Sequence, residues 1–326
     1  MSEIVIGVDL GGTNVKTALV SRDRELLAKD SRPTNAEGGP ESVMAVMEAS
    51  IRDLLKAEAI RMDEVLAVGF GAPGPMNWQT GVVYSPPNLP GWSNVPLAQR
   101  MMERLEGVPC FVDNDANVAC YGEYWMGAGR GTESMVVLTL GTGVGGGVVV
   151  FGQLLRGIDG TAAELGHLKV HRDGRLCGCG SRGCLESYAS VSGMVQTALD
   201  GLAQGKLSPA LLNLCGGDTG AIDGKMIFDA AQQGDAFAQW VFEETAEWLG
   251  LGIASIINYQ NPEKVVLCGG MIEAGELLFA PVRRVAKANC FKVPGDRCEI
   301  VPAGLGSDSG VLGCAGCALA RFEAER

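Results

Sequence analysis

The chain has 326 residues, enough for two domains of ordinary size, each with its own core. Its formal net charge of −12 argues against a nucleic-acid or polyanion surface, because such surfaces need clustered Lys and Arg. No basic and apolar leader follows Met1, and no apolar run approaches the roughly 18 residues of a membrane span. We therefore expect a cytoplasmic protein without a membrane partner, whose eleven cysteines are reduced thiols or metal ligands.

The first predicted element is an apolar strand over Ile4 to Leu10, which contains Asp9 near its end. Gly11-Gly12-Thr13 follows, and a second strand runs from Val15 to Val20. This pattern predicts a hairpin whose turn amides point outward, an arrangement that binds phosphate oxygens. Taken alone, the same residues also fit an ordinary hairpin with a glycine turn.

The second half of the chain repeats this pattern. A strand over Met135 to Leu140 leads into the glycine-rich turn of residues 141–147, which contains Gly141, Thr142 and Gly143, and a strand follows over 148–151. The spacing matches GxGxxG, but a dinucleotide fingerprint must open a helix, so we reject that interpretation. Two similar hairpins predict a duplicated α/β fold with a cleft between the copies.

Between the hairpins, helical spacing predicts a helix over 41–59, and an apolar run predicts a strand over 65–70. Prolines make residues 85–92 a loop. Asn88 and Trp92 of this loop are candidate ligand contacts, with an exposed loop around a packed Trp as the alternative.

An acidic step, Asp113-Asn114-Asp115-Ala116-Asn117, follows a predicted strand over 108–112 and begins a helix that reaches about Met126. One of its polar residues can cap the helix and complement the helix dipole. A carboxylate at the carboxyl end of a strand is also where an open α/β sheet mounts a general base. Capping needs only one of these polar residues, so the surplus favours a functional role.

The stretch from Glu164 to Glu186 gathers both histidines of the chain, His167 and His171, and three of its cysteines. The cysteines are Cys177, Cys179 and Cys184. Thiolates and an imidazole are preferred ligands of a closed tetrahedral zinc site, so a structural zinc knuckle is the first hypothesis. A buried group of free cysteines beside an unrelated histidine is the alternative.

The remaining pattern alternates helices and strands. The apolar part of the helix over 236–259, from Trp248 onward, indicates deep burial or a subunit interface. Gly269 and Gly270 follow a strand, and the turn is a candidate for holding a nucleotide, with close packing of helix on strand as the alternative. The elements predicted here are helices over 185–202, 225–233, 236–259, 275–288 and 308–322 and strands over 265–268 and 300–303.

Four motifs resemble those of the ROK family of sugar kinases and repressors, whose superfamily also holds actin and hexokinases. They are DLGGT (9–13), DNDAN (113–117), LTLGTGVGGG (138–147) and CGCGSRGCLE (177–186). The second departs from the family's ENDAN by Asp113 in place of Glu. Within the family the sequence is most similar to the bacterial glucokinases.

The resemblance implies an α/β fold that is a duplicated ribonuclease-H-like, actin- or hexokinase-type pair of domains. Its small domain would hold residues 1–114 plus 307–326, and its large domain, with the zinc knuckle, residues 115–306. The resemblance and the apolar helix after Trp248 also suggest a homodimer.

The resemblance implies ATP-dependent phosphorylation of a hexose, with glucose as the first choice and transfer in line from the γ-phosphate. Asp115 would be the general base, and Asp9 would hold hydrated Mg2+. The implied phosphate and nucleotide contacts are Asp9, Gly11, Gly12, Thr13, Gly141, Thr142, Gly143, Gly269 and Gly270. The implied sugar contacts are Asn88, Asn114, Asp115, Glu164, His167 and Glu186.

By the same resemblance, the structural Zn2+ would be bound by His167, Cys177, Cys179 and Cys184. One ring nitrogen of His167 could then bind the metal while the other faces a sugar hydroxyl. The cysteine cluster favours ATP over polyphosphate as donor.

Other functions stay open at this point. The family's kinases for N-acetylmannosamine, N-acetylglucosamine and fructose share most of these motifs. A non-catalytic sugar sensor is disfavoured by the intact Asp115, and only eight residues precede Asp9, too few for the repressors' DNA-binding domain. A zinc hydrolase needs an open coordination position, which three cysteines and one histidine would fill.

Overall fold

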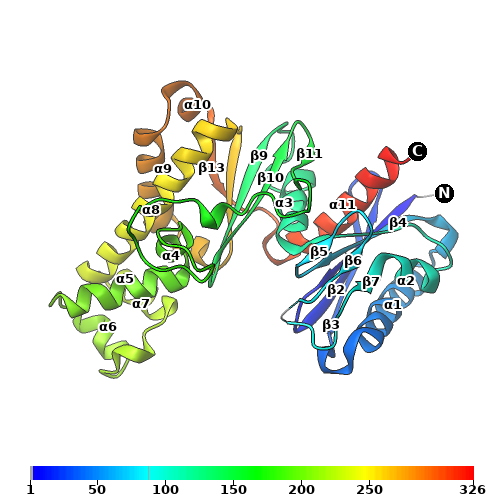
Figure 1. The fold of residues 1–326 in the computed structure, drawn as a ribbon, viewed down its shortest axis with the longest axis horizontal. Coiled ribbons are helices and arrows are strands. Elements are labelled where there is room, and N and C mark those ends of the chain that lie inside the picture. Colours follow the sequence, from blue (N-terminus) through cyan, green and yellow to red (C-terminus); the bar gives the residue numbers. More distant parts are fainter. Residues whose placement is uncertain (1–2, 87) are drawn as a thin grey trace. The chain divides into compact units, whose positions relative to one another are not determined.

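The computed structural model describes residues 3–86 and 88–326, and they form two compact units (Figure 1). The first unit comprises Met1–Gly131, Gly147–Ala163 and Gly304–Arg326, and the second comprises Thr132–Gly146 and Glu164–Ala303. This division places α3 in the first unit, because that helix packs against α11. The domain boundaries at 114/115 and 306/307 stay a prediction.

The first unit is built on a five-stranded sheet with the order β3-β2-β1-β4-β8. Strands β1, β2 and β3 form antiparallel pairs, whereas β1, β4 and β8 are parallel. The first hairpin is therefore confirmed, and its register sets Asp9 opposite Lys16. The strands are β1 (Ile4–Leu10), β2 (Asn14–Ser21), β3 (Leu26–Pro33), β4 (Val65–Ala72) and β8 (Cys110–Asn114).

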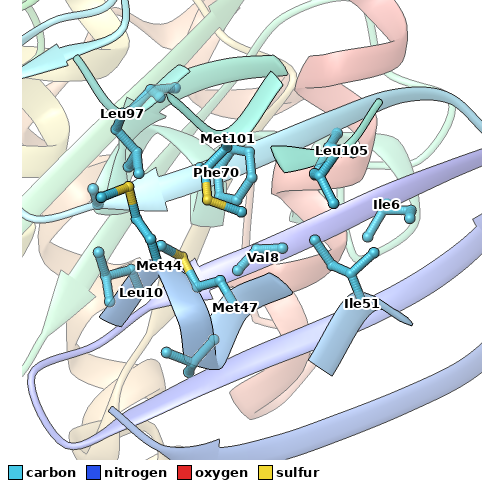
Figure 2. Close-up of a cluster of buried hydrophobic side chains, with 14 of the residues drawn as sticks. Ile6, Val8, Leu10, Met44, Met47, Ile51, Phe70, Leu97, Met101 and Leu105 are labelled. Carbon is cyan, nitrogen blue, oxygen red and sulfur yellow. The ribbon is translucent and has the colours of Figure 1, made fainter. Parts of the chain in front are cut away.

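Helices cover both faces of this sheet. Helix α1 (Gly39–Ala57) packs on β2 and β3, and α2 (Leu97–Arg104) packs on β8, while α11 (Ser309–Ala324) packs on β1, β4 and α3 (Asp115–Trp125). Strand β1 is buried on both of its faces, which explains its continuous apolar sequence. Figure 2 shows the core on one face, with side chains from β1, β4, α1, α2 and the residue that follows α2: Ile6, Val8, Leu10, Met44, Met47, Ile51, Phe70, Leu97, Met101 and Leu105.

Helix α11 lies directly on two strands because glycines face it. A Cβ added at Gly7 would lie 1.9 Å from the carbonyl oxygen of Val311, and one at Gly69 would lie 2.0 Å from that of Cys314. Any side chain at these positions would push the helix off the sheet. Cys314 and Cys317 are buried in this interface.

The second sheet has the order β11-β10-β9-β12-β13, with β9, β12 and β13 parallel. The predicted glycine turn over 141–147 is too long, because β10 already begins at Val144. Gly147 lies inside this strand, where a Cβ would come within 2.3 Å of the Cβ of Cys120. The strands are β9 (Met135–Leu140), β10 (Val144–Val150), β11 (Gln153–Leu154), β12 (Lys264–Cys268) and β13 (Glu299–Pro302).

Both sheets thus share one topology: the first strand of a hairpin pairs, on its other side, with the first of two parallel strands. The predicted duplicated α/β fold is confirmed by this shared strand order. A third, small sheet of the first unit has the order β5-β6-β7, with strands at Met76–Asn77, Val82–Val83 and Val95–Pro96.

The predicted helix over 185–202 is two helices, since Ser190 interrupts it and accepts a hydrogen bond on Oγ from Gly193 N at 3.0 Å. Helix α8 packs on α9, and Leu249, Ile253 and Ile257 of its apolar part are buried within the second unit. Burial thus accounts for this apolar sequence, and a homodimer stays a prediction. The helices are α4 (Glu186–Ala189), α5 (Val191–Ala203), α6 (Pro209–Leu214), α7 (Gly224–Gln232), α8 (Ala236–Gln260), α9 (Glu276–Asn289) and α10 (Lys292–Arg297).

Among the helices that the structure describes, none combines the length and the apolar character that a membrane crossing requires.

The buried carboxylate of Glu123 joins two segments of the first unit at its boundary. Glu123 is fully buried at the end of α3. Its Oε2 accepts hydrogen bonds from Ala128 N and Gly304 N, each at 2.9 Å, and its Oε1 accepts one from Leu305 N at 3.0 Å. Residues 128 and 304–305 lie next to the points where the chain leaves this unit for the second and returns from it.

We expect Glu123→Gln to lower the free energy of unfolding by about 2–4 kcal/mol, because the new amide group faces backbone donors that lose their acceptor. Urea unfolding followed by circular dichroism measures this, with the exposed Glu58→Gln as control. Hydrogen exchange at Gly304 and Leu305 should accelerate in the same variant. Unchanged exchange at both amides would contradict the assigned contacts.

Candidate functional site

The turn of the first hairpin is anchored at its base by hydrogen bonds and is exposed at its tip. Gly11 N donates to Asn14 O at 3.0 Å, so the amide of Gly11 closes the turn. Thr34, which is fully buried, donates from Oγ1 to Gly11 O at 2.6 Å and from N to Thr13 O at 2.8 Å. Gly12 and Thr13 form the exposed tip, and theirs are the amides that an incoming anion would meet first.

Asp9 lies at the end of β1, beside the first turn of α11. A Cβ at Gly310 would lie 2.6 Å from its Oδ2. Burial raises the pKa of the Asp9 carboxyl, with the cation of Lys16 working to lower it and the Asp115 carboxylate to raise it further. The two carboxylates therefore interact. Lys16 is a functional candidate that sequence reasoning missed, although its place opposite Asp9 in a hairpin could have indicated it.

The polar residues of the segment from Asp113 to Asn117 have different roles, some structural and one available for chemistry. Asn114 is the helix cap, since its Oδ1 accepts from Ala116 N at 2.9 Å and Asn117 N at 3.4 Å. Asp113 is buried and pairs with Arg156, Nε to Oδ2 at 2.6 Å. Asp115 is the first residue of α3 and is exposed. The predicted cap is thus Asn114, the ion pair of Asp113 was not predicted, and Asp115 is left at the surface.

The environment of Asp115 suits a general base. Desolvation by the surrounding protein raises the pKa of its carboxyl, although the amide of Ala116 donates to Oδ1 at 2.8 Å and works in the opposite direction. A carboxylate that is less well solvated than in water is a stronger proton acceptor.

The two candidate residues of the loop over 85–92, Asn88 and Trp92, lie in different environments. Trp92 is 4 % exposed and belongs to the core of the first unit, so the packed alternative is correct for this side chain. Asn88 is exposed, and its Cβ lies 3.4 Å from the position of a Cβ added at Gly12. Asn88 therefore lies beside the exposed tip of the first turn.

In the second unit, the predicted metal ligands come together. The ligand atoms of His167, Cys177, Cys179 and Cys184 all lie within 4.8 Å of one another. The Sγ atoms of Cys179 and Cys184 are 3.7 Å apart, and Nδ1 of His167 is 3.7 Å from Sγ of Cys177. These four side chains form a cluster that can bind a metal ion.

The donor set and its spacing fit zinc. A tetrahedral ion with Zn–S bonds of about 2.3 Å separates its sulfurs by about 3.8 Å, close to the spacing seen. Because Nδ1 of His167 faces the thiols, Nε2 is the ring nitrogen left for another partner. Lys169 Nζ lies 2.8 Å from Sγ of Cys184, where its charge offsets that of a thiolate. His171 lies outside the cluster, and its ring centre is 5.8 Å from that of Trp248.

Glu186 connects the metal cluster to the second glycine turn. Its Oε1 is 3.5 Å from Sγ of Cys177, and its Oε2 accepts from Val144 N at 3.0 Å. A Cβ at Gly143 would lie 2.4 Å from the same Oε2. Because Glu186 follows Cys184 by two residues, its bond from Val144 N ties the segment that carries the cluster to the turn, a coupling that the sequence does not indicate.

Glu164 is exposed and precedes the short helix Leu165–His167. Gly166 of this helix lies against the start of β10, where a Cβ would be 2.0 Å from Val144 O. This contact fixes the segment that carries Glu164 and His167 against the second glycine turn.

The second glycine turn lines one cavity of its unit. Gly141 N donates to Gly143 O at 3.0 Å, and Thr142 is exposed at the tip. A cavity of about 690 Å3 is lined by Thr142, Gly143 and Glu186, together with polar residues of α5 and Arg175.

A second cavity, of about 450 Å3, has a largely apolar lining that includes Met194, Phe228, Phe242 and Gly270. Gly269 has a different role, because its φ of 93° and its contact with Leu140 O, 2.3 Å from an added Cβ, require glycine for the backbone itself. The packing alternative thus applies to Gly269, while Gly270 borders a cavity.

The predicted site residues form two groups. Those of the first unit are Asp9, Gly11, Gly12, Thr13, Asn88, Asn114 and Asp115, and those of the second are Gly141, Thr142, Gly143, Glu164, His167, Glu186, Gly269, Gly270 and the metal cluster.

The chain has a duplicated α/β fold, a glycine turn in each half and a His/Cys cluster in the second half. These features define a class of proteins, which comparison with known proteins identifies. The model of the ROK family matches residues 5–321. The chain belongs to the ROK family, and the predicted resemblance is confirmed. The fold is accordingly that of the actin- and hexokinase-type proteins.

Three relatives show the range of similarity. A glucokinase of Thermotoga maritima is 41% identical over 95% of this chain and 96% of its own. An N-acetylmannosamine kinase of Escherichia coli is 32% identical over 95% and 96%. The crystal structure of a ROK family glucokinase from Streptomyces griseus in complex with glucose and AMPPNP is 35% identical, with a TM-score of 0.74 over 97% of this chain and 99% of that one.

Proposed function

We propose that this protein is an ATP-dependent hexose kinase that phosphorylates glucose. The observation that carries the proposal is the exposed carboxylate of Asp115 at the first residue of α3, with a raised pKa and with Asp9 near enough to interact. The similarity to kinases that act on glucose or on N-acetylmannosamine supports a sugar as the acceptor.

The proposed chemistry assigns one task to each part. Asp115 accepts the proton of the sugar hydroxyl on C6 as the oxygen of that hydroxyl attacks the γ-phosphorus. Asp9 would hold hydrated Mg2+, which would neutralise charge on the phosphates. The exposed tips at Gly12 to Thr13 and at Thr142 to Gly143 bind phosphate oxygens through backbone amides.

The substrates are held by residues already described. The apolar cavity of about 450 Å3 beside Gly270 suits a purine base. A neutral sugar offers only hydroxyls, so its contacts must be fixed donors and acceptors. We assign this role to Asn88, Asn114, Asp115, Glu164, His167 and Glu186.

The metal cluster binds structural Zn2+ in this proposal. His167, Cys177, Cys179 and Cys184 fill a tetrahedron, so the ion has no open position for catalysis. Its effect is to orient His167, whose Nε2 then meets a sugar hydroxyl.

A panel of sugars tests the proposal. ADP release is measured with Mg-ATP and each of glucose, N-acetylmannosamine, N-acetylglucosamine and fructose. We expect the highest kcat/KM with glucose. A higher value with another sugar would change the acceptor and keep the kinase, whereas no turnover with any hexose would refute the proposed activity.

A further inference from the structure

The buried Asp113 lies immediately before the cap of α3 and uses its two oxygens for different purposes. Oδ2 accepts from Arg156 Nε at 2.6 Å. Oδ1 accepts from Asn114 N at 2.9 Å and from Nδ2 of Asn117 at 3.1 Å. One oxygen therefore binds a cation, and the other binds residues on both sides of Asp115.

These contacts determine where Asp115 lies. Asn114 must keep its extended backbone, with φ of −68° and ψ of 145°, for its side chain to cap the helix. Asp113 fixes the amide of Asn114, and it also fixes the side chain of Asn117, which is 3% exposed. Asp115 stands between two residues that are held by one carboxylate.

The cation is itself held firmly from several segments of the first unit. The guanidinium of Arg156 lies 4.8 Å from the centre of the Trp78 ring. Arg321, from α11, lies 5.3 Å from the same ring centre and donates to Trp78 O at 2.7 Å. Arg156 is thus fixed by packing as well as by charge, so the direction from which it approaches Asp113 is set in advance.

Stability alone is a weak reason for such a pair. Burying two charges costs much of what their attraction returns, and apolar side chains of similar size often serve as well. What an apolar pair cannot provide is an oxygen with a fixed orientation at Asn114 and Asn117. A carboxylate that Arg156 holds on one side presents its other oxygen in one direction only.

We propose that the Arg156–Asp113 ion pair is a positioning device that sets the place of Asp115 through Asn114 and Asn117. The inference rests on the proposed function, because it takes Asp115 as the general base. Arg156 and Asp113 act through other residues, so they are positioning residues. A displacement of a reacting group by about 1 Å can cost roughly 100-fold in rate, which is the size of effect expected here.

Four variants test the proposal in the full-length protein: Asp113→Asn, Arg156→Met, Arg156→Lys and the double variant Asp113→Leu with Arg156→Met. For Asp113→Asn and Arg156→Met we expect kcat to fall about 30- to 100-fold, while KM for ATP changes less than about 3-fold. Arg156→Lys keeps the charge and should recover part of the loss seen with Arg156→Met.

The double variant separates positioning from stability. Each single variant that leaves one buried charge unpaired should also lower the Tm, and the double variant should restore it because both charges are gone. We expect kcat of the double variant to stay at least about 30-fold below wild type, since no oxygen faces Asn114 and Asn117. Recovery of kcat together with Tm would overturn the proposal.

Two controls keep the outcomes distinct. Arg104→Met breaks the half-buried pair of Arg104 with Glu48, 2.9 Å apart in the same unit, and should leave kcat unchanged. Asp115→Asn reports on the base itself. If Asp115→Asn stays active, the proposed base is wrong, whereas an inactive Asp115→Asn beside a fully active double variant would refute only the positioning role.

Discussion

Replacing Asp115 by asparagine is expected to lower kcat by about 10²- to 10⁴-fold and to leave sugar binding largely intact. That range is what a positioned general base contributes. The variant keeps the oxygen that accepts from Ala116 N and loses only the basic group. Steady-state kinetics gives kcat, and calorimetry with sugar alone gives the affinity. Asp23→Asn removes the same charge at an exposed site and is the control.

The raised pKa of Asp115 adds a pH dependence to this prediction. The carboxyl must be ionised to accept a proton, so kcat/KM should fall as pH drops through its folded pKa, which lies above 3.8. The residual rate of Asp115→Asn should lack this acid limb. Equal activity of the variant and the wild type at neutral pH would require another base.

The stability of the fold should change with pH in the opposite direction to kcat/KM. A carboxyl whose folded pKa is raised binds protons more readily in the folded state, so stability is lost as pH rises from the unfolded to the folded pKa. Above the folded pKa, the full loss of stability applies. Asp115→Asn should therefore have a higher Tm than wild type at neutral pH and an equal one below the unfolded pKa, as thermal unfolding across pH would reveal.

Replacing Cys184 by serine is expected to abolish metal binding and to lower the Tm by roughly 10 °C or more. Cys184 is fully buried, and a hydroxyl is a poorer zinc ligand than a thiolate. Elemental analysis should find one zinc per chain in the wild type and much less in the variant. Cys215→Ser, also in the second unit and buried but outside the cluster, is the matched control and should keep the metal.

Chelation distinguishes a structural from a catalytic ion. Because the metal would tie His167 to the three cysteines, and Gly166 beside His167 packs against Val144 O, removal of the metal should loosen the second glycine turn, and activity should disappear together with folded structure. Loss of activity from a protein that keeps its Tm would instead support a catalytic metal.

The sequence predicted most of the fold because its main signals are local. Strand β1 was predicted at its observed bounds, since a strand buried on both faces must be apolar throughout. Strand β3 was missed because its residues alternate between exposed and half-buried positions at the sheet edge. The break at Ser190 was missed because the apolar pattern runs across it, and only the cap contact with Gly193 shows where one helix ends and the next begins.

The candidate site divides in the same way. The metal ligands lie within one short stretch, so their grouping could be predicted from spacing. The surplus of polar residues beside Asp115 also pointed to the base. Arg156 could not be found, because it meets Asp113 across 43 residues, and nothing in the sequence between them marks the contact. Long-range pairs of this kind depend on the assembled sheet.

The position of α11 has a consequence for synthesis of the protein. This helix covers β1 and β4, with Gly7 and Gly69 against its backbone, yet it consists of residues 309–324. On the ribosome, the strands are synthesised before the helix that covers them. Their apolar face stays exposed while about 240 residues between β4 and α11 are added, which takes tens of seconds. All of the second unit leaves the ribosome during that interval and can fold before the first is complete. The oldest part of the nascent chain is thus among the last to be buried.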